Sequence, residues 1–380
     1  MSGINLTMTR AQIEVDLSAI AANVRKVIKE TKVDVCAVVK ADAYGHGLVP
    51  IAQAATDAGA KWLGVALLEE AINLRTHGLQ LPIISWLTPL TEDFDNALRH
   101  DIDLGISSLS LLEKVMAAGE RTGITPRIHI EVDTGMTRGG VLNEWPVFLK
   151  KVSAATLSEK VKLIGFFSHF ARADEPDKIE NELQLKKFTE LLSELKATGV
   201  TPKYLHLANS AAALSNPSVS FDFVRLGIAM YGLSPDVKTM GSSKTLGLIP
   251  AMTLCAKLHL VKQVPAGAAV GYGGSAITNR ETKVGIVAMG YADGIPRNAD
   301  NSTGVFFNGD RAPILGRVSM DQFVVDLGLN SKAITGDEVI VFGAGNVGEY
   351  TVDDWASASA TINYEIVTRI ASRVPRIYKR

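Results

Sequence analysis

Cysteine is nearly absent from this chain, which has only Cys36 and Cys255 in 380 residues. The two lie far apart and each sits in an apolar run, so a disulfide-stabilised scaffold is excluded and buried thiols in a reducing compartment are expected. An excess of charge of one sign is also missing, since 39 Lys and Arg residues balance 40 Asp and Glu residues. Without a basic excess, the sequence predicts no nucleic-acid partner.

Long apolar runs are missing as well. No stretch approaches the roughly 20 apolar residues that a membrane-spanning helix needs, and residues 1–10 lack the basic segment and apolar core of a secretory signal. We therefore expect a cytoplasmic protein with no membrane partner.

Strand-like and helical patterns alternate through the first part of the chain. The strand-like runs are 35–39, 62–67, 82–86, 102–106, 127–132, 162–167, 203–207 and 223–226. Helical spacing of apolar residues lies between them, at 17–28, 48–58, 68–77, 109–118 and 179–195. Eight such units within about 230 residues predict an α/β fold, a (β/α)8 TIM-like barrel.

The pattern changes after residues 236–247, which are rich in Ser, Gly, Lys and Thr and are typical of a linker. Short alternating runs then follow without long helices, at 256–264, 283–289, 305–307, 312–315, 322–326 and 337–342. Only 353–371 has helical spacing there. We expect the barrel over 10–240 and a mostly antiparallel β domain over 241–380.

Gly343 to Gly348 spell G-x-G-x-x-G, but the following residues, 349–352, do not open a helix. A dinucleotide site needs that helix and a parallel βαβ unit around it, so this interpretation is not favoured. The histidines show no metal-ligand spacing, and no metal is expected.

One lysine occupies a distinctive position. Lys40 ends the apolar run 35–39, and Gly45 and Gly47 then turn the chain. In a (β/α)8 barrel the active site lies at the C-terminal ends of the strands. A lysine there either pairs with a carboxylate or reacts with a carbonyl group, because burial makes its amine lose the proton more readily.

Two later segments fit a phosphate site. Ser210 follows the seventh strand-like run and Gly227 follows the eighth, where such barrels commonly bind phosphate. An amine facing a phosphate site is what pyridoxal phosphate requires. The alternative is that Ser210 caps a helix and Gly227 forms an ordinary turn.

Several segments resemble the bacterial alanine racemases, a family of fold-type III pyridoxal phosphate enzymes. The first, Val39-Lys40-Ala41-Asp42-Ala43-Tyr44-Gly45-His46-Gly47, resembles their cofactor-lysine signature. The likeness continues, in the family's order, at 132–136 (VDTGM), 167–171 (FSHFA), 208–211 (ANSA), 224–232 (VRLGIAMYG), 270–273 (VGYG), 290–294 (GYADG), 316–322 (GRVSMDQ) and 362–365 (INYE).

This resemblance implies a two-base reaction on alanine. Lys40 would bind the cofactor and act as the base on one face of the substrate, and Tyr272, from the second domain of a partner subunit, would serve the opposite face. A homodimer with shared active sites is implied, supplying D-alanine for peptidoglycan. His169 and His206 are the candidates for polar neighbours that favour the Tyr272 phenolate, or else they are structural residues.

The same resemblance implies the remaining contacts. Arg225 would face the pyridine nitrogen, and since a guanidinium keeps its proton, the ring would be a weaker electron sink, which favours reprotonation over transamination. Arg138 and the backbone of Met320 would meet the substrate carboxylate, while Tyr291 and Tyr364 would narrow the entrance and limit substrate size. The residues implied to hold the cofactor are Lys40, Tyr44, His169, Ser210, Arg225, Gly227, Ile228 and Tyr364.

Two positions depart from the family. Many relatives carry a carbamylated lysine where this chain has Glu131. A glutamate provides the negative charge directly, so we expect Glu131 to pair with Arg138. Ser319 stands where a cysteine is frequent, and no consequence follows from this change.

Two alternatives stay open. One is a racemase of broader or different specificity, acting on serine or lysine. The other is a non-catalytic pyridoxal phosphate carrier, like the single-domain barrels that bind this cofactor. A second domain bearing Tyr272 and Met320 argues against the carrier.

Overall fold

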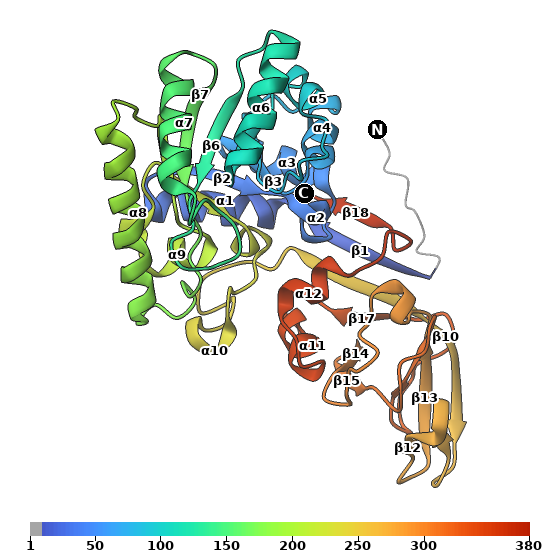
Figure 1. Ribbon diagram of the computed structural model, residues 1–380. Helices are drawn as coiled ribbons and strands as arrows, with labels where there is room; N and C mark the ends of the chain where they lie inside the picture. The colour runs from blue at the N-terminus through green and yellow to red at the C-terminus, as the bar shows by residue number, and fades with distance from the viewer. Residues whose placement is uncertain (1–9) are drawn as a thin grey trace. The chain divides into compact units, whose positions relative to one another are not determined.

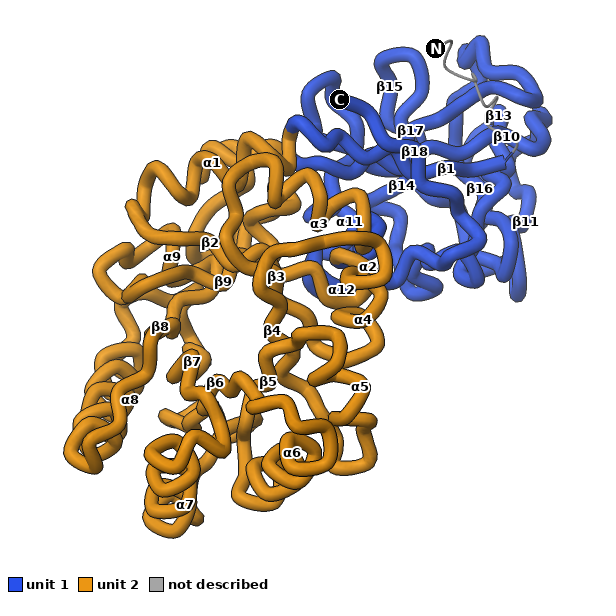
Figure 2. The backbone as a smooth tube through the Cα atoms, turned by 90° about the horizontal axis from the view of Figure 1, so that it is seen from above, with its two compact units in different colours: residues 1–18, 44–47, 250–380 blue, residues 19–43, 48–249 orange. Residues whose placement is uncertain are grey.

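The computed structural model describes residues 10–380, which fall into two compact units. We call residues 19–43 and 48–249 the barrel unit, and the described residues 10–18, 44–47 and 250–380 the C-terminal unit. Figure 2 shows the two units in different colours.

The barrel unit contains the eight expected strands, all parallel, in the order β8-β7-β6-β5-β4-β3-β2-β9. Figure 2 shows them as a ring seen from above. Between β8 and β9, Asp222 N donates to Leu205 O at 3.0 Å and Arg225 N donates to Ala208 O at 2.9 Å, which nearly closes the barrel. The strands are β2 (Asp34–Val38), β3 (Trp62–Val65), β4 (Ile83–Ser85), β5 (Asp103–Ile106), β6 (Arg127–Glu131), β7 (Lys162–Phe167), β8 (Tyr204–His206) and β9 (Phe223–Leu226).

Helices surround this ring of strands (Figures 1 and 2). The helices cover the outer face of the strands, and side chains inside the barrel cover the inner face, which is why β3, β4, β5 and β9 are buried along their whole length. The helices are α1 (Leu17–Thr31), α2 (Lys40–Tyr44), α3 (Leu48–Asp57), α4 (Leu68–Thr76), α5 (Phe94–Arg99), α6 (Leu109–Thr122), α7 (Trp145–Leu157), α8 (Ile179–Ala197), α9 (Ser210–Ser215) and α10 (Val237–Met240), with 3-10 turns η1 (Pro217–Val219) and η2 (Ile228–Tyr231).

The C-terminal unit is built on a mostly antiparallel sheet, as expected. Its strands follow the order β15-β14-β17-β10-β1-β18, and β13 pairs with both β10 and β16. The strands are β1 (Ala11–Asp16), β10 (Met252–Val264), β11 (Ala269–Val270), β12 (Ala276–Ile277), β13 (Thr282–Val287), β14 (Gly304–Phe307), β15 (Asp310–Pro313), β16 (Phe323–Asp326), β17 (Glu338–Phe342) and β18 (Arg376–Lys379), with turns η3 (Tyr272–Gly274) and η4 (Tyr291–Asp293).

Strand β1 was not anticipated. It pairs antiparallel with β10 and parallel with β18, so residues 11–16 group with the C-terminal unit although the expected barrel range 10–240 includes them. The alternation that encodes it is visible: Ala11, Ile13 and Val15 are buried, and the residues between them are partly exposed.

The helical expectation over 353–371 is wrong as one element. Two short helices, α11 (Val352–Ala358) and α12 (Asn363–Thr368), lie there instead. Between them Ala360 has φ 52°, a left-handed conformation that ends a right-handed helix.

The glycine-rich loop 343–348 has a structural explanation. The carboxylate of Glu349 accepts hydrogen bonds from the amides of Gly345, Asn346 and Val347 at 2.8, 3.3 and 2.9 Å. The loop's own glutamate therefore occupies the place where a phosphate would bind in a dinucleotide site.

Residues 10–380 contain neither a candidate membrane span nor a candidate metal site. None of the helices is long and apolar enough to cross a membrane. No group of three or more His, Cys, Asp or Glu side chains is arranged to hold a metal ion.

The turn after the Lys40 segment gives a stability prediction. Gly45 has φ +78°, and a Cβ atom added there would lie 2.2 Å from Val367 O. Gly45→Ala should therefore cost roughly 3 kcal/mol or more of unfolding free energy, from strain and overlap together. Gly78→Ala is the control, because Gly78 has φ +85° with no atom within 4 Å, and it should cost only the backbone strain of about 1–2 kcal/mol. Equal shifts of the two urea denaturation midpoints would contradict this account.

Candidate active site

The residues that the resemblance singles out divide between the two units. Those of the barrel unit lie at or after the C-terminal ends of strands, and they are Lys40, Arg138, His169, Ser210, Arg225, Gly227 and Ile228. Those of the C-terminal unit are Tyr44, Tyr272, Tyr291, Met320 and Tyr364.

Lys40 follows β2 and is largely removed from solvent. Burial lowers the pKa of Lys40 below the ordinary lysine value, the positive charge of Arg138 lowers it further, and the carboxylate of Glu70 partly opposes both. The amine is therefore deprotonated more readily than that of a solvated lysine, as a nucleophile or base requires.

Arg225 lies on β9, opposite Cys36 of β2, and is 5% exposed. Its Nη1 donates to His206 Nδ1 at 3.0 Å and to His206 O at 2.9 Å. Its Nη2 donates to His169 Nδ1 at 3.1 Å and to the carbonyl oxygens of Ser168 and Leu207 at 2.6 and 3.2 Å. None of the Asp and Glu residues within 10–380 comes within 4.0 Å of the guanidinium as an ion pair.

Burial lowers the pKa of Arg225 to about 10. At neutral pH the side chain is still a cation, and a guanidinium has no lone pair with which to accept. His169 and His206 must therefore present bare Nδ1 atoms to it. The pKa of each histidine is lowered, first by burial and then by the charge of Arg225, so both rings are neutral.

Ser210 is not the cap of α9. That position belongs to Asn209, whose side chain accepts from Ala212 N at 3.0 Å. The Ser210 hydroxyl instead accepts from the amides of Gly227 and Ala229 at 2.9 and 3.4 Å. It thereby ties the start of α9 to the segment that follows β9.

A residue that the sequence analysis missed holds the chain just after Lys40. Ala41, Asp42 and Ala43 all have φ between 52° and 54°, a left-handed turn of residues with side chains, which costs about 1–2 kcal/mol per residue. One oxygen of Glu70 accepts from Ala41 N at 2.6 Å, and the other accepts from the amides of Ala66 and Leu67 at 3.0 and 3.1 Å. Glu70 thus fastens this turn to the start of α4.

The expected ion pair between Glu131 and Arg138 is wrong for this structure. No nitrogen of Arg138, which is exposed, lies within 4.0 Å of the Glu131 carboxylate. Glu131 Oε1 lies instead beside Gly139, 3.1 Å from where a Cβ atom of that residue would be. Burial raises the pKa of Glu131, and the charges of Arg225 and Arg138 offset only part of that rise.

In the C-terminal unit a buried carboxylate organises two loops. Asp293 accepts from Arg10 Nη2 at 2.8 Å, Arg373 Nε at 2.6 Å and Gly290 N at 2.8 Å. Burial alone would raise the pKa of Asp293, but these donors outweigh it and the pKa lies below the ordinary value. Beside it, Tyr291 N donates to Ser319 O and Ala292 N donates to Met320 O, both at 3.0 Å, which brings the Tyr291 and Met320 loops together.

The aromatic residues of the C-terminal unit differ in exposure. The Tyr44 and Tyr364 rings lie 6.2 Å apart, and the Tyr44 side chain is buried. Tyr272, in η3, is 73% exposed.

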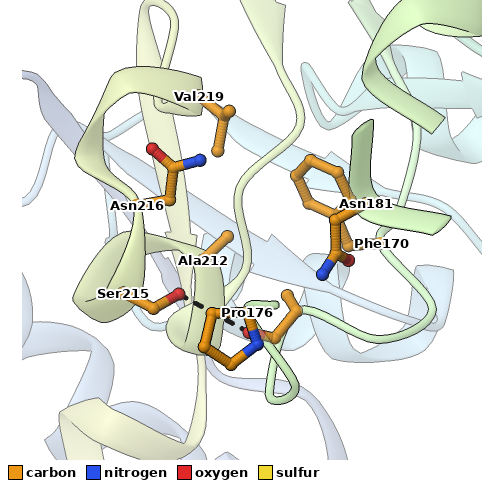
Figure 3. Close-up of a pocket in the computed structure, with 8 residues that line it drawn as sticks. Phe170, Pro176, Asn181, Ala212, Ser215, Asn216 and Val219 are labelled. Atoms are coloured by element: carbon orange, nitrogen blue, oxygen red, sulfur yellow. Dashed lines mark hydrogen bonds between the residues drawn. The ribbon is translucent and has the colours of Figure 1, made fainter. Parts of the chain in front are cut away.

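Figure 3 shows a small cavity under the loop after β7. Its volume is about 30 Å³, which suits a single water molecule and no larger group. None of the candidate residues lines it; its walls are formed by Phe170, Ala173, Pro176, Asn181, Ala212, Ser215, Asn216 and Val219.

Removing the Glu131 charge should stabilise the protein at neutral pH. The pKa of Glu131 is raised in the folded state, so its contribution to stability is complete below about pH 4 and is lost as pH rises through that folded-state pKa. Glu131→Gln should therefore melt at a higher temperature than the parent at pH 7, and the difference should shrink towards pH 4. Glu190→Gln, at an exposed site on α8, is the control and should change little. A lower melting temperature for Glu131→Gln at pH 7 would indicate an ion pair after all.

Removing the Glu70 carboxylate should loosen the Lys40 turn. Glu70→Ala leaves three amides without their acceptor and should lower the free energy of unfolding by about 1–3 kcal/mol. Glu69→Ala removes the same charge from the first turn of α4 at an exposed position, so it controls for the helix dipole and should cost much less. Equal losses for the two variants in chemical denaturation would show that the three amide bonds are not what matters.

Comparison with known proteins relates both units to one family. Residues 15–235 match the family model of the alanine racemase N-terminal domain, and residues 251–378 match that of the alanine racemase C-terminal domain. The chain is 46% identical to the alanine racemase of Salinispora tropica over 373 residues, which cover 98% of this chain and 99% of that protein.

Solved structures agree. The alanine racemase from D-cycloserine-producing Streptomyces lavendulae superposes with a TM-score of 0.96 at 46% identity, covering 98% of each chain. The alanine racemase from Bacillus anthracis, solved with bound L-Ala-P, superposes with a TM-score of 0.88 at 37% identity, covering 98% of this chain and 96% of that one.

Proposed function

Because this chain belongs to the alanine racemase family, we propose that it interconverts L-alanine and D-alanine with pyridoxal phosphate as cofactor. The observation that carries the proposal is the placement of two basic residues on neighbouring strands. Lys40, an amine of lowered pKa, follows β2, and Arg225, a buried cation, lies on β9. A reactive amine beside a fixed donor is suited to a cofactor that carries an aldehyde and a pyridine ring.

The donor set fits that cofactor. Lys40 would bind it covalently, and the Arg225 guanidinium would donate a hydrogen bond to the ring nitrogen without giving up its proton. We propose that the phosphate is held by Ser210, Gly227 and Ile228 together with Tyr44 and Tyr364, with His169 beside the ring. When bound, pyridoxal phosphate withdraws electrons from the α-carbon of an amino acid and so makes its α-proton acidic.

Racemisation requires a proton to leave one face of the α-carbon and another to arrive at the opposite face. We propose that Lys40 serves one face and Tyr272 of the partner subunit serves the other. The high exposure of Tyr272 within one subunit supports this, because such a side chain is available to a second copy of the chain. The protein would then be a homodimer whose two active sites each need both subunits.

Substrate recognition is proposed to involve the C-terminal unit. Arg138 and the backbone of Met320 would bind the substrate carboxylate, and the Tyr291 loop, held by Asp293, would limit side-chain size. D-Alanine for peptidoglycan is the product this role implies. A cytoplasmic location is supported by the two buried free thiols, which suit a reducing compartment.

The alternatives differ in measurable ways. A racemase of broader specificity would act on serine or lysine as fast as on alanine, and a non-catalytic carrier would bind the cofactor without turnover. The test is to follow optical rotation of L-alanine and D-alanine separately, with serine and lysine in parallel. Convergence of both alanine samples to zero rotation, with the others slow, supports alanine. No change with any amino acid, despite bound cofactor, would overturn the proposal.

The assignment of Tyr272 has its own test. Tyr272→Phe should slow racemisation of both enantiomers by roughly 10²–10⁴-fold, because one face of the α-carbon loses its acid–base group. Exchange of the α-hydrogen with heavy water should survive for the enantiomer whose proton Lys40 removes, and it should be lost for the other. Tyr350→Phe is the control and should leave both rates unchanged. The Tyr350 ring packs against Arg311, whose Cζ lies 4.4 Å from the ring centroid. Unchanged rates in Tyr272→Phe would remove this residue from the mechanism.

A further inference from the structure

Arg225 is the end of a longer line of buried polar groups. On the other side of the His206 ring, His206 Nε2 lies 3.0 Å from His129 Nδ1. His129 Nε2 in turn lies 3.3 Å from Asp103 Oδ2. His206, His129 and Asp103 are each no more than 1% exposed. We call Arg225, His206, His129 and Asp103 the Arg225–Asp103 chain.

The Arg225–Asp103 chain runs through the inside of the barrel. Asp103 opens β5 at the N-terminal end of the strands, His129 lies in the middle of β6, and His206 closes β8. The interior of such a barrel is ordinarily filled by layers of branched apolar side chains. Polar groups buried at these positions lose their hydration, which costs free energy unless hydrogen bonds replace it.

The surrounding residues fit the two histidine rings. The His206 ring stacks between Phe167 and Phe223, with centroids 4.7 and 4.3 Å away. A Cβ atom on residue 165 would lie 1.9 Å from His129 Nδ1, so glycine at that position leaves room for the ring. Both rings are thus held in one orientation by packing.

The hydrogen bonds of the chain can run in only one direction. Arg225 only donates, so His206 Nδ1 accepts and the proton of this neutral ring sits on Nε2. His206 Nε2 then donates to His129 Nδ1, which places the His129 proton on Nε2, where it donates to the Asp103 carboxylate. Each ring accepts at Nδ1 and donates at Nε2.

The Arg225–Asp103 chain also connects the buried positive charge of Arg225 to a carboxylate. Arg225 has no carboxylate within ion-pair distance, although the charge of Glu131 acts on it, and a buried cation without a close partner is costly. Asp103 is the carboxylate that the chain reaches. Its other partner, Arg127, donates to Asp103 Oδ1 at 2.5 Å, and both Arg127 and Arg75 pair with the exposed Asp101. Asp103 therefore ends the line of hydrogen bonds as an ionised acceptor whose position is fixed.

We propose that Asp103 and His129 are positioning residues for the racemase reaction, which hold Arg225 in place through a line of two neutral, aligned imidazoles that ends on a carboxylate. The inference rests on the proposed function, in which Arg225 faces the cofactor ring. Asp103 keeps the two imidazoles aligned and so orients the guanidinium, which then donates to the ring nitrogen without giving up its proton.

The first test does not depend on activity. Nitrogen-15 NMR of histidine-labelled, full-length holoenzyme at neutral pH should find His129 and His206 both neutral, with hydrogen on Nε2 and none on Nδ1. A proton on Nδ1 of either ring, or on both nitrogens, would overturn the proposal. Since the wild-type protein is used, this result stands whether or not a variant folds, and it is separate from the optical-rotation test of the function.

The second test removes the charge but keeps the acceptor. Asp103→Asn should slow racemisation roughly tenfold, as loss of a supporting carboxylate commonly does, and should raise the number of transamination events per racemisation. Asp101→Asn, which also pairs with Arg127 but does not touch His129, should change neither. A folded Asp103→Asn enzyme with the parent rate and parent partition would overturn the proposal.

Discussion

The barrel unit depends on how the buried charge of Arg225 is accommodated. Its hydrogen bonds go to carbonyl oxygens and to two imidazole nitrogens, and none goes to a carboxylate. Because a guanidinium only donates, these neighbours must be neutral acceptors, which fixes the protonation of His169 and His206. Burial is the main cause of the lowered pKa of Lys40 and of the raised pKa of Glu131, and the charge of Arg225 adds to the first and opposes the second. Burial and the Arg225 charge therefore act together on these groups.

The backbone around Lys40 and the loops of the C-terminal unit are fixed by carboxylates that do not face the reaction. Glu70 secures the left-handed turn after Lys40, and Asp293 secures the loops that carry Tyr291 and Met320. In each case the oxygens of a partly or fully buried carboxylate accept hydrogen bonds from backbone amides or arginines. Such anchors give loops the precision that a site needs.

The barrel was predictable because each strand is a short apolar run bounded by a helix, a signal local to the sequence. Strand β1 was missed because its partners, β10 and β18, lie more than 230 residues further on. His129 and Asp103 were missed because their roles come from contacts between strands that lie apart in the sequence. Glu70 lies within four residues of two of its partners, but the third, Ala41, lies 29 residues earlier. The Glu131–Arg138 pairing failed because charge complementarity in sequence says nothing about where an exposed arginine points.

The proposal that Lys40 and Tyr272 act together from different subunits is tested most directly by mixing two inactive variants. Lys40→Ala and Tyr272→Phe subunits would be unfolded, mixed in equal amounts and refolded with pyridoxal phosphate. Each mixed dimer would contain one intact site, so racemisation should return to about a quarter of the wild-type rate for random pairing. Recovery of no activity, with mixed dimers demonstrated, would contradict the shared site.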